Sequence, residues 1–540
     1  MASIDARTDI GEMASGRVKP KAIAKSRNTL IPIAIAVAAM IASAFYTWLQ
    51  GQDANWDWQN YHEYNVWAIL NDRYGTDVLP AGFQTYFSPV VYFPVYYLRH
   101  FLPAPYGSLI IGALHGLNLV VIYFVARVLM REAASASAIA AAILIAASGP
   151  MTLVEVGTSF ADILTALPVI AGFALVVSAD ESKWTRYIFA GVLIGAAVGL
   201  KLTNVVFALG AAACLLLSAR PLLALPCLAI GGAVGAAASG GAWSMMLWRE
   251  LGNPFFPLFN AIMTSKELQP VNILDLQFLP RGVLDALAYP FYWLVTGTQT
   301  AERPFRDARF AVVTVLLVIT FFARLAGRAP VLARQDSQFL VFFLTSYFAW
   351  LGLFSIQRYA VVLELLCGPL IVLLIARVLA LSARYDTPDW APKRNGVMML
   401  SIAAAVALWC QPGDWLHRPW SLPYQPNISE RLQRPAVYLL LDKPVAYVAP
   451  QLPPQSRFYQ LADIALSILR DGEFDRRIRA GLADPLPGGI WELHIRDKEF
   501  RRDLLDTYGL QVDGSKSCVE IEGVVPSTAL VACPLESRSK

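Results

Sequence analysis

The residues most able to do chemistry in this sequence are two aspartates directly after the first hydrophobic span. Asp53 and Asp57 lie in the run Gly51–His62, which follows the apolar stretch Leu30–Leu49. Carboxylates are costly near a bilayer, so acids at the exit of a membrane helix are candidates for function. Their neighbours include His62 and several aromatic residues, which suit a membrane–water boundary. This composition predicts chemistry at the membrane surface, on a substrate with an apolar and a polar end.

The same segment also fits a simpler interpretation. Its four aromatic residues, Trp56, Trp58, Tyr61 and Tyr64, could form an interfacial belt, with the acids merely solvated. The residues from Tyr61 to Leu70 could then lie on the membrane surface as one amphipathic helix.

Further charged residues are predicted at the outer ends of later spans. Asp162 begins one span, Lys201 lies in a turn between two short spans, Arg249 opens a long loop, and Arg358 with Tyr359 precedes another span. A carboxylate can act as a general base on a hydroxyl, and cations can stabilise a phosphate leaving group. The alternatives are snorkelling of Lys201 and Arg358 toward headgroups, and a helix N-terminal role for Asp162.

The composition indicates a polytopic α-helical membrane protein. The chain has 540 residues, of which 56% are hydrophobic and 16% charged, with a mean hydropathy of +0.48. Soluble domains carry roughly 25% charged residues. The net charge of +4 is spread over short loops, so the sequence predicts no nucleic-acid partner.

About eleven transmembrane helices are expected. They are Leu30–Leu49, Tyr106–Met130, Ala134–Ala147, Phe160–Ser178, Tyr187–Leu200, Thr203–Ser218, Leu222–Trp248, Phe310–Phe322, Phe339–Phe354, Tyr359–Leu381 and Asn395–Cys410. Tyr86–Phe101 is read as an interfacial or re-entrant helix because it contains prolines and many aromatic residues. The basic segment before Leu30 predicts a cytoplasmic N-terminus. The odd helix count then places the C-terminus outside, in the periplasm if the membrane is the inner one.

Three regions follow from this reading. Residues 1–28 form a cytoplasmic tail. Residues 29–410 form the membrane core with outer loops 51–105 and 249–309, and residues 411–540 form a small periplasmic α+β domain. Within that domain, strands are expected at Ala436–Leu441, Val445–Val448 and Ile490–Ile495, and helices at Tyr459–Leu469 and Asp497–Tyr508.

The cysteines are relevant to the predicted location of the C-terminal domain outside the cytoplasm. Four of the six lie in or beside apolar spans and are expected to be small core residues. Cys518 and Cys533 flank two strand-like runs, and a hairpin centred on Val525 would make them cross-strand neighbours. A disulfide there would stabilise by about 3 kcal/mol and would suit an oxidising compartment. Two unpaired thiols remain the alternative.

These features together resemble the GT-C superfamily of multi-span glycosyltransferases that use polyprenyl-phosphate-linked sugars. The resemblance covers about residues 30–381. It is carried by the acidic first outer loop with the run Asp57–His62, the turn Gly199–Lys201, the segment Gly252–Pro257, and Arg358–Tyr359. No single one of these segments is specific to the superfamily. The resemblance rests on their order along the chain and on their predicted position on one side of the membrane.

The resemblance implies an inverting transfer in which an outer-loop acid activates the acceptor hydroxyl. That role maps to Asp57, with Asp53 in reserve. From their predicted positions on the outer side, the residues expected to hold the donor phosphate are Lys201, Arg358, Tyr359, His62 and Arg249. His62 could equally be an interfacial amphipathic residue, and Asp162, Asn60 and Tyr61 are further site candidates. The paired adjacent acids of the family are absent here, which leaves the base and any divalent metal requirement open.

No cofactor is expected, because no histidine or cysteine cluster has the spacing of a zinc site. The expected partners are a polyprenyl-phosphate-linked sugar donor, a lipid or glycan acceptor in the cell envelope, and membrane lipids. Two alternatives stay open, a transporter or flippase for a lipid-linked sugar and a ligase or polymerase that moves a whole glycan. A transporter would favour charged or broken helices near mid-membrane, whereas the polar residues here gather at outer helix ends.

Overall fold

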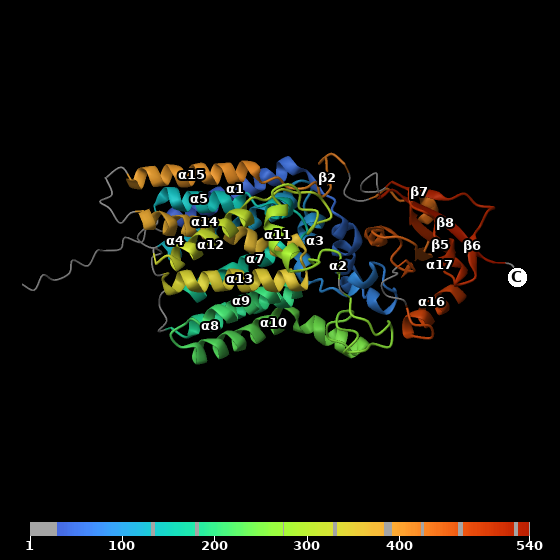
Figure 1. Cartoon of the computed structure of the whole chain (residues 1–540). Coiled ribbons are helices and arrows are strands. Elements are labelled where there is room, and N and C mark those ends of the chain that lie inside the picture. Colours follow the sequence, from blue (N-terminus) through green and yellow to red (C-terminus); the bar gives the residue numbers. More distant parts are fainter. Residues whose placement is uncertain are drawn as a thin grey trace, which may run out of the picture.

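A bundle of helices and a smaller part with a β-sheet at one end of the bundle make up the molecule (Figure 1). The computed structural model describes residues 30–130, 135–178, 183–273, 275–327, 332–382, 391–422, 426–462, 468–522 and 528–538. The expected cytoplasmic tail, residues 1–28, lies outside these described residues.

Each of the eleven expected spans coincides with a helix, to within a few residues. The helices are α1 (Leu30–Gln50), α4 (Tyr106–Met130), α5 (Ala136–Ala147), α7 (Asp162–Val177), α8 (Thr185–Leu200), α9 (Val205–Leu215), α10 (Pro221–Leu251), α12 (Arg309–Leu325), α13 (Arg334–Leu353), α14 (Val361–Ser382) and α15 (Ala391–Trp409). By length and composition, four are able to cross a membrane: Leu30–Gln50, Tyr106–Met130, Pro221–Leu251 and Gln357–Leu379. Five others are shorter but apolar. The chain is a multi-pass, mainly helical membrane protein.

The segment Gln357–Leu379, which contains most of α14, lies at the centre of the bundle. Within its most apolar window 89% of the residues are buried, against 11% for α1. Helix α14 contacts α4, α5, α7, α12 and α13. The residues just before it therefore emerge at the middle of one end of the bundle.

Close packing of small residues holds α8 against α10. A side-chain carbon at Gly195 would collide with Gly232, and one at Gly235 would collide with the Val192 carbonyl. Small residues let two helix backbones approach closely inside a membrane. This contact fixes the end of α8, where Lys201 begins the next turn.

The first outer loop is folded into short helices. A π-helical turn (Trp58–His62) runs into α2 (Glu63–Leu70), and α3 (Phe93–Phe101) follows. Helix α3 has nine residues and is about 14 Å long, too short to span a bilayer. The expected helix at 61–70 exists, and its residues up to Ala68 are buried within the protein. The C-terminal part covers it, with the Trp58 and Tyr447 rings 5.8 Å apart.

The C-terminal part is built on a six-stranded mixed sheet. Its strands are β3 (Val437–Leu440), β4 (Arg457–Gln460), β5 (Ile490–Ile495), β6 (Leu510–Val512), β7 (Val519–Ile521) and β8 (Leu530–Ser537). The order is β4-β3-β5-β8-β6, with β7 also pairing to β8. All of β3 is buried: Tyr438 and Leu440 face the first outer loop, while Val437 and Leu439 face α16 (Glu473–Ala483) and α17 (Arg502–Asp506). The expected α+β fold is confirmed.

Three local predictions in this part were wrong. Val445–Val448 is no strand but the start of a 3₁₀ helix, Ala446–Gln451, beside prolines that lack the N–H a ladder needs. The stretch predicted as a helix from Tyr459 begins in β4, because pairing with β3 overrides local propensity; residues 463–467 of it lie outside the described residues. The second predicted helix shrinks to α17.

Cys518 and Cys533 form a disulfide at the end of the β7–β8 ladder. Its predicted turn centre, Val525, lies outside the described residues. The four other cysteines are free and buried.

The sheet is tied to the loop that carries the two aspartates. Val78 bridges to Tyr459 in parallel and so extends the sheet beyond β4. Arg73 is ion-paired to Asp77 at 2.7 Å and donates to backbone carbonyls of the C-terminal part. The C-terminal part therefore braces the first outer loop.

Candidate active site

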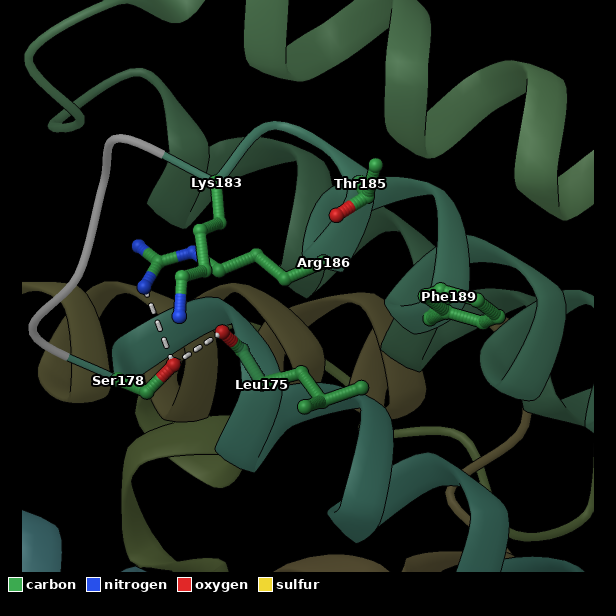
Figure 2. A pocket seen from close by; sticks show the side chains of 6 residues that line it. All are labelled: Leu175, Ser178, Lys183, Thr185, Arg186 and Phe189. Atoms are coloured by element: carbon green, nitrogen blue, oxygen red, sulfur yellow. Dashed lines mark hydrogen bonds between the residues drawn. The ribbon is translucent and has the colours of Figure 1, made fainter.

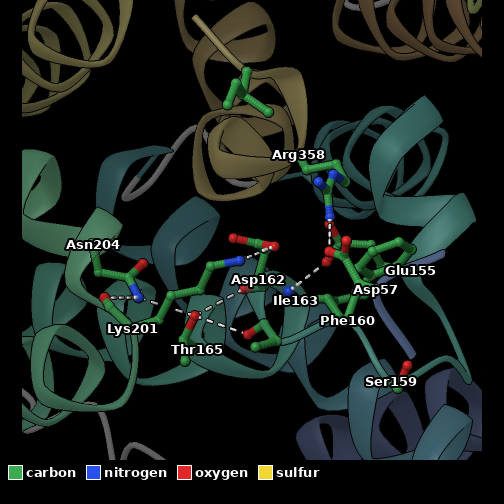
Figure 3. Close-up of polar contacts among 12 residues, drawn as sticks. Asp57, Glu155, Ser159, Phe160, Asp162, Ile163, Thr165, Lys201, Asn204 and Arg358 are labelled. Atoms are coloured by element: carbon green, nitrogen blue, oxygen red, sulfur yellow. Dashed lines mark hydrogen bonds and ion pairs between the residues drawn. The ribbon is translucent and has the colours of Figure 1, made fainter. Parts of the chain in front are cut away.

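Asp57 and Arg358 form an ion pair at the end of the bundle that faces the sheet (Figure 3). The carboxylate oxygen Oδ2 of Asp57 lies 2.6 Å from Nη1 of Arg358, across 301 positions of sequence. The Tyr61 hydroxyl donates to the same oxygen at 3.3 Å. The Arg358 guanidinium lies 4.8 Å from the Phe160 ring and 5.1 Å from the Trp415 ring. Aromatic faces of this kind stabilise a cation away from water.

A second ion pair lies beside the first. Lys201 reaches Oδ2 of Asp162 at 2.6 Å, and its ammonium lies 4.7 Å from the Tyr359 ring. Arg358 lies 6.0 Å from that same ring, so both cations lie near Tyr359. Asn204 donates to Thr165 and to the Ala197 carbonyl, which holds the turn after α8. Four predicted site residues thus meet from four parts of the chain.

Asp53 has a different environment. Its Oδ2 accepts from Arg99 at 2.7 Å and from the Ser159 backbone, and its Oδ1 accepts from Asn55 twice. Its side chain is 1% exposed, against 11% for Asp57. Both oxygens of Asp53 are occupied, whereas no described donor reaches Oδ1 of Asp57. Asp53 therefore holds the first outer loop in place through its hydrogen bonds. Oδ1 of Asp57 remains available to accept a hydrogen bond or a proton.

The pKa shifts of Asp53 and Asp57 agree with their different environments. Burial opposes ionisation of both acids, but the Arg99 charge outweighs it and lowers the pKa of Asp53 to about 2. For Asp57, burial is outweighed by the charges of Arg358 and Lys201, so its pKa lies below the ordinary value. Both acids are ionised at neutral pH.

Other predicted residues of the first loop support the site. His62 stacks on Tyr92 with ring centroids 4.0 Å apart, and its Nδ1 lies 2.9 Å from the Ser159 hydroxyl. Burial lowers the pKa of His62 to about 3, which keeps the imidazole neutral. Asn60 donates to Ala81 and Gln84 and thereby holds the loop together.

Arg249 is not brought to this cluster. It lies exposed in the last turn of α10, and among the described residues no hydrogen bond or ion pair connects it to the other candidates.

Several residues near the site escaped the sequence reasoning. Phe160 and Trp415 line Arg358, and Arg99 pairs with Asp53. Glu155, the last residue of α6 (Pro150–Glu155), is fully buried beside Asp162. In the sequence, Glu155 is a single acid in an apolar stretch between two expected spans. An ionisable residue in such a place is costly and is therefore a candidate for function, and this signal could have identified Glu155.

A buried charge network anchors α6. Arg309 is ion-paired to Asp307 at 2.6 Å and to Glu364 at 3.2 Å, with all three side chains fully buried. Glu364 also accepts from the backbone and hydroxyl of Thr152 in α6. Because α14 and α12 hold α6 through these bonds, the position of Glu155 is fixed relative to Arg358.

A separate cavity of about 370 Å³ lies at the opposite end of the helices (Figure 2). It is lined by Leu175, Ser178, Lys183, Thr185, Arg186 and Phe189. The Arg186 guanidinium there already donates to Ser178 and to the Tyr187 hydroxyl. This cavity holds none of the predicted site residues. Among the described residues, no three histidine, cysteine or acidic side chains gather as metal ligands.

The overall fold is similar to that of a solved structure, ArnT, over most of the chain. The crystal structure of ArnT from Cupriavidus metallidurans bound to undecaprenyl phosphate has a TM-score of 0.51 to this chain at 12% identity, and the match covers 94% of this chain and 98% of ArnT. The apo form of the same ArnT has a TM-score of 0.49, with 12% identity and coverage of 93% and 97%. No family model and no curated protein matches the sequence.

Proposed function

We propose that the protein is a glycosyltransferase that moves a sugar from a polyprenyl-phosphate donor to a hydroxyl of a cell-envelope acceptor, with inversion. The observation that carries the proposal is the meeting of Asp57 with Arg358, and of Lys201 with Asp162, at one end of a GT-C fold. The related ArnT structure holds undecaprenyl phosphate, which supports a polyprenyl phosphate as the lipid here. The site faces the C-terminal part, so the reaction would take place on the periplasmic side of the inner membrane.

In this proposal Asp57 is the general base. The acceptor oxygen attacks the anomeric carbon and its proton passes to the spare oxygen Oδ1 of Asp57. The bond from the anomeric carbon to the phosphate oxygen breaks, and its electron pair leaves with polyprenyl phosphate. Positioned bases of this kind typically contribute about 10²–10⁴-fold to the rate.

Arg358 and Lys201 stabilise the phosphate in this proposal. Each is neutralised by an acid in the resting site, so an arriving phosphate competes with a carboxylate for each cation. In the part of the chain that the structure describes, no group accepts from the buried Nε of Arg358, which leaves this N–H free to donate to a ligand. When Arg358 turns to the phosphate, Asp57 loses the charge that lowers its pKa and becomes a stronger base.

These two cations also supply the positive charge that a metal would otherwise provide. We propose that no resident metal is needed. The transfer activity should therefore survive a chelator, and loss of activity with EDTA, restored by a divalent ion, would contradict this point.

The direct test is a transfer assay on purified protein, with a donor-containing polyprenyl lipid fraction and envelope acceptor. We expect release of polyprenyl phosphate from the parent and a loss of at least about a hundredfold in Asp57→Asn. Undecaprenyl phosphate should still bind to that variant. Full activity in Asp57→Asn would remove Asp57 as the base. Movement of intact donor across the membrane without cleavage would favour a transporter instead.

A further inference from the structure

Glu155 has an unusual position for a carboxyl group. It is 0% exposed at the end of α6, and only one of its oxygens is bonded. Oε2 accepts from the Ile163 backbone at 2.7 Å, while the buried Oε1 has no hydrogen-bond partner among the described residues. An ionised carboxylate in a buried place needs several donors or a cation of its own. Glu155 has neither.

The nearby cations are already matched to other acids. Lys201 lies 2.6 Å from Asp162, and Arg358 lies 2.6 Å from Asp57. Two positive and two negative charges therefore make the resting cluster neutral if Glu155 carries a proton. Burial, and then the charge of Asp162, raise the pKa of Glu155 well above its usual range.

The charge of the cluster decides what it can bind. A donor phosphate adds one negative charge to a buried site, where charges interact strongly. With Glu155 neutral, the loaded cluster carries one negative charge. With Glu155 ionised, it would carry two, close together and poorly solvated.

We infer that Glu155 is a proton-holding residue of the donor site, and that its neutrality is the condition under which the cluster accepts an anionic lipid phosphate. This inference rests on the proposed function for the identity of the ligand. By this inference, donor selection by charge depends on a residue of α6 and not on a residue of the first loop.

The groups that face Glu155 come from every neighbouring element. They are Asp162 of α7, Lys201 after α8, Arg358 and Glu364 around the start of α14, Asp57 of the first loop, and His115 of α4, whose Nδ1 accepts from the Gly157 backbone. Asp57 is held ionised, and His62 and Tyr61 are held neutral by burial. A loss of affinity that the parent shows and that Glu155→Gln does not show therefore reports on Glu155.

The test measures binding of undecaprenyl phosphate to the detergent-purified full chain between about pH 6 and pH 9, a window above the ordinary pKa of a glutamate. The parent should bind at least about tenfold more weakly at the alkaline end, relative to Glu155→Gln. Glu155→Gln keeps the shape but cannot ionise, so its affinity should change only as the probe itself titrates. Glu155→Asp keeps a titrating group and should retain the alkaline loss.

An infrared spectrum gives a second reading that does not depend on the ligand. The parent at neutral pH should show a protonated-carboxyl band that is missing in Glu155→Gln, and that disappears from the parent at alkaline pH. Superimposable pH curves for parent and Glu155→Gln, or no such band in the parent, would overturn the inference and leave the proposed function standing. Failure of the parent to bind the probe at any pH would overturn the donor site itself.

Discussion

Asp53 and Asp57 show how two acids four residues apart take different roles. Asp53 accepts hydrogen bonds on both oxygens and is 1% exposed, whereas Asp57 shares one oxygen with Arg358 and keeps the other free. A saturated carboxylate holds structure, because any reaction would cost it several bonds. For this reason we propose Asp57, and not Asp53, as the general base of the site.

Removal of the Asp53 charge should weaken the fold in a pH-dependent way. The pKa of folded Asp53 is about 2, below its ordinary value of 3.8. Its ionisation thus stabilises the fold above about pH 4, and this contribution of about 2–3 kcal/mol is lost as the pH falls toward 2. Asp53→Asn should lower the thermal unfolding temperature at pH 7, and the gap to the parent should shrink in acid. An equal gap at both pH values would argue against the Arg99 pairing.

Arg358 should be needed for its shape as well as its charge. Arg358→Ala should weaken binding of undecaprenyl phosphate by at least about tenfold, and Arg358→Lys should recover only part of it, because lysine lacks the planar fork. Arg249→Ala is the matched control, since Arg249 is exposed and away from the cluster. Unchanged binding in Arg358→Ala would exclude Arg358 from the phosphate site.

At the scale of helices, the contact between α8 and α10 positions Lys201. Gly235→Ala places a methyl group against the Val192 carbonyl, while Gly241→Ala on the same helix meets only Ala237 at ordinary contact distance. We expect Gly235→Ala to destabilise by about 1–3 kcal/mol. Gly241→Ala should stay within about 0.5 kcal/mol of the parent. Thermal unfolding of both variants in detergent checks this, and equal melting temperatures would contradict the close packing.

The bundle could be predicted because each span is a local run of apolar residues. The eleven expected spans, α4 among them at its full length, carry that signal on their own. Tyr459–Gln460 could not be placed, because the partners of β4 are β3 and the distant Val78. The sequence predicted which residues belong to the site and that they lie on one side of the membrane, but not which of them contact one another. The pairing of Asp57 with Arg358, 301 positions apart, depends on how the helices pack.

At the scale of the whole molecule, the C-terminal part and the first outer loop form one unit. The Arg73–Asp77 pair and the Val78–Tyr459 bridge join them, so the sheet should lie on the same side of the membrane as the site. We expect the Cys518–Cys533 bond to persist in natively purified protein, where alkylation should modify these thiols only after reduction. Ready alkylation without reduction, or a cytoplasmic signal from a reporter fused after Lys540, would contradict a periplasmic placement.

The central claim is that this cluster transfers a sugar from a polyprenyl phosphate. The most direct measurement is mass spectrometry of polyprenyl lipids and envelope glycans from cells that carry the parent, Asp57→Asn, or no copy of the protein. The account predicts that Asp57→Asn and the deletion accumulate the same polyprenyl-phosphate-linked sugar and lack the same sugar in an envelope glycan. Lipids and glycans in Asp57→Asn cells that match the parent, while the deletion differs, would contradict it.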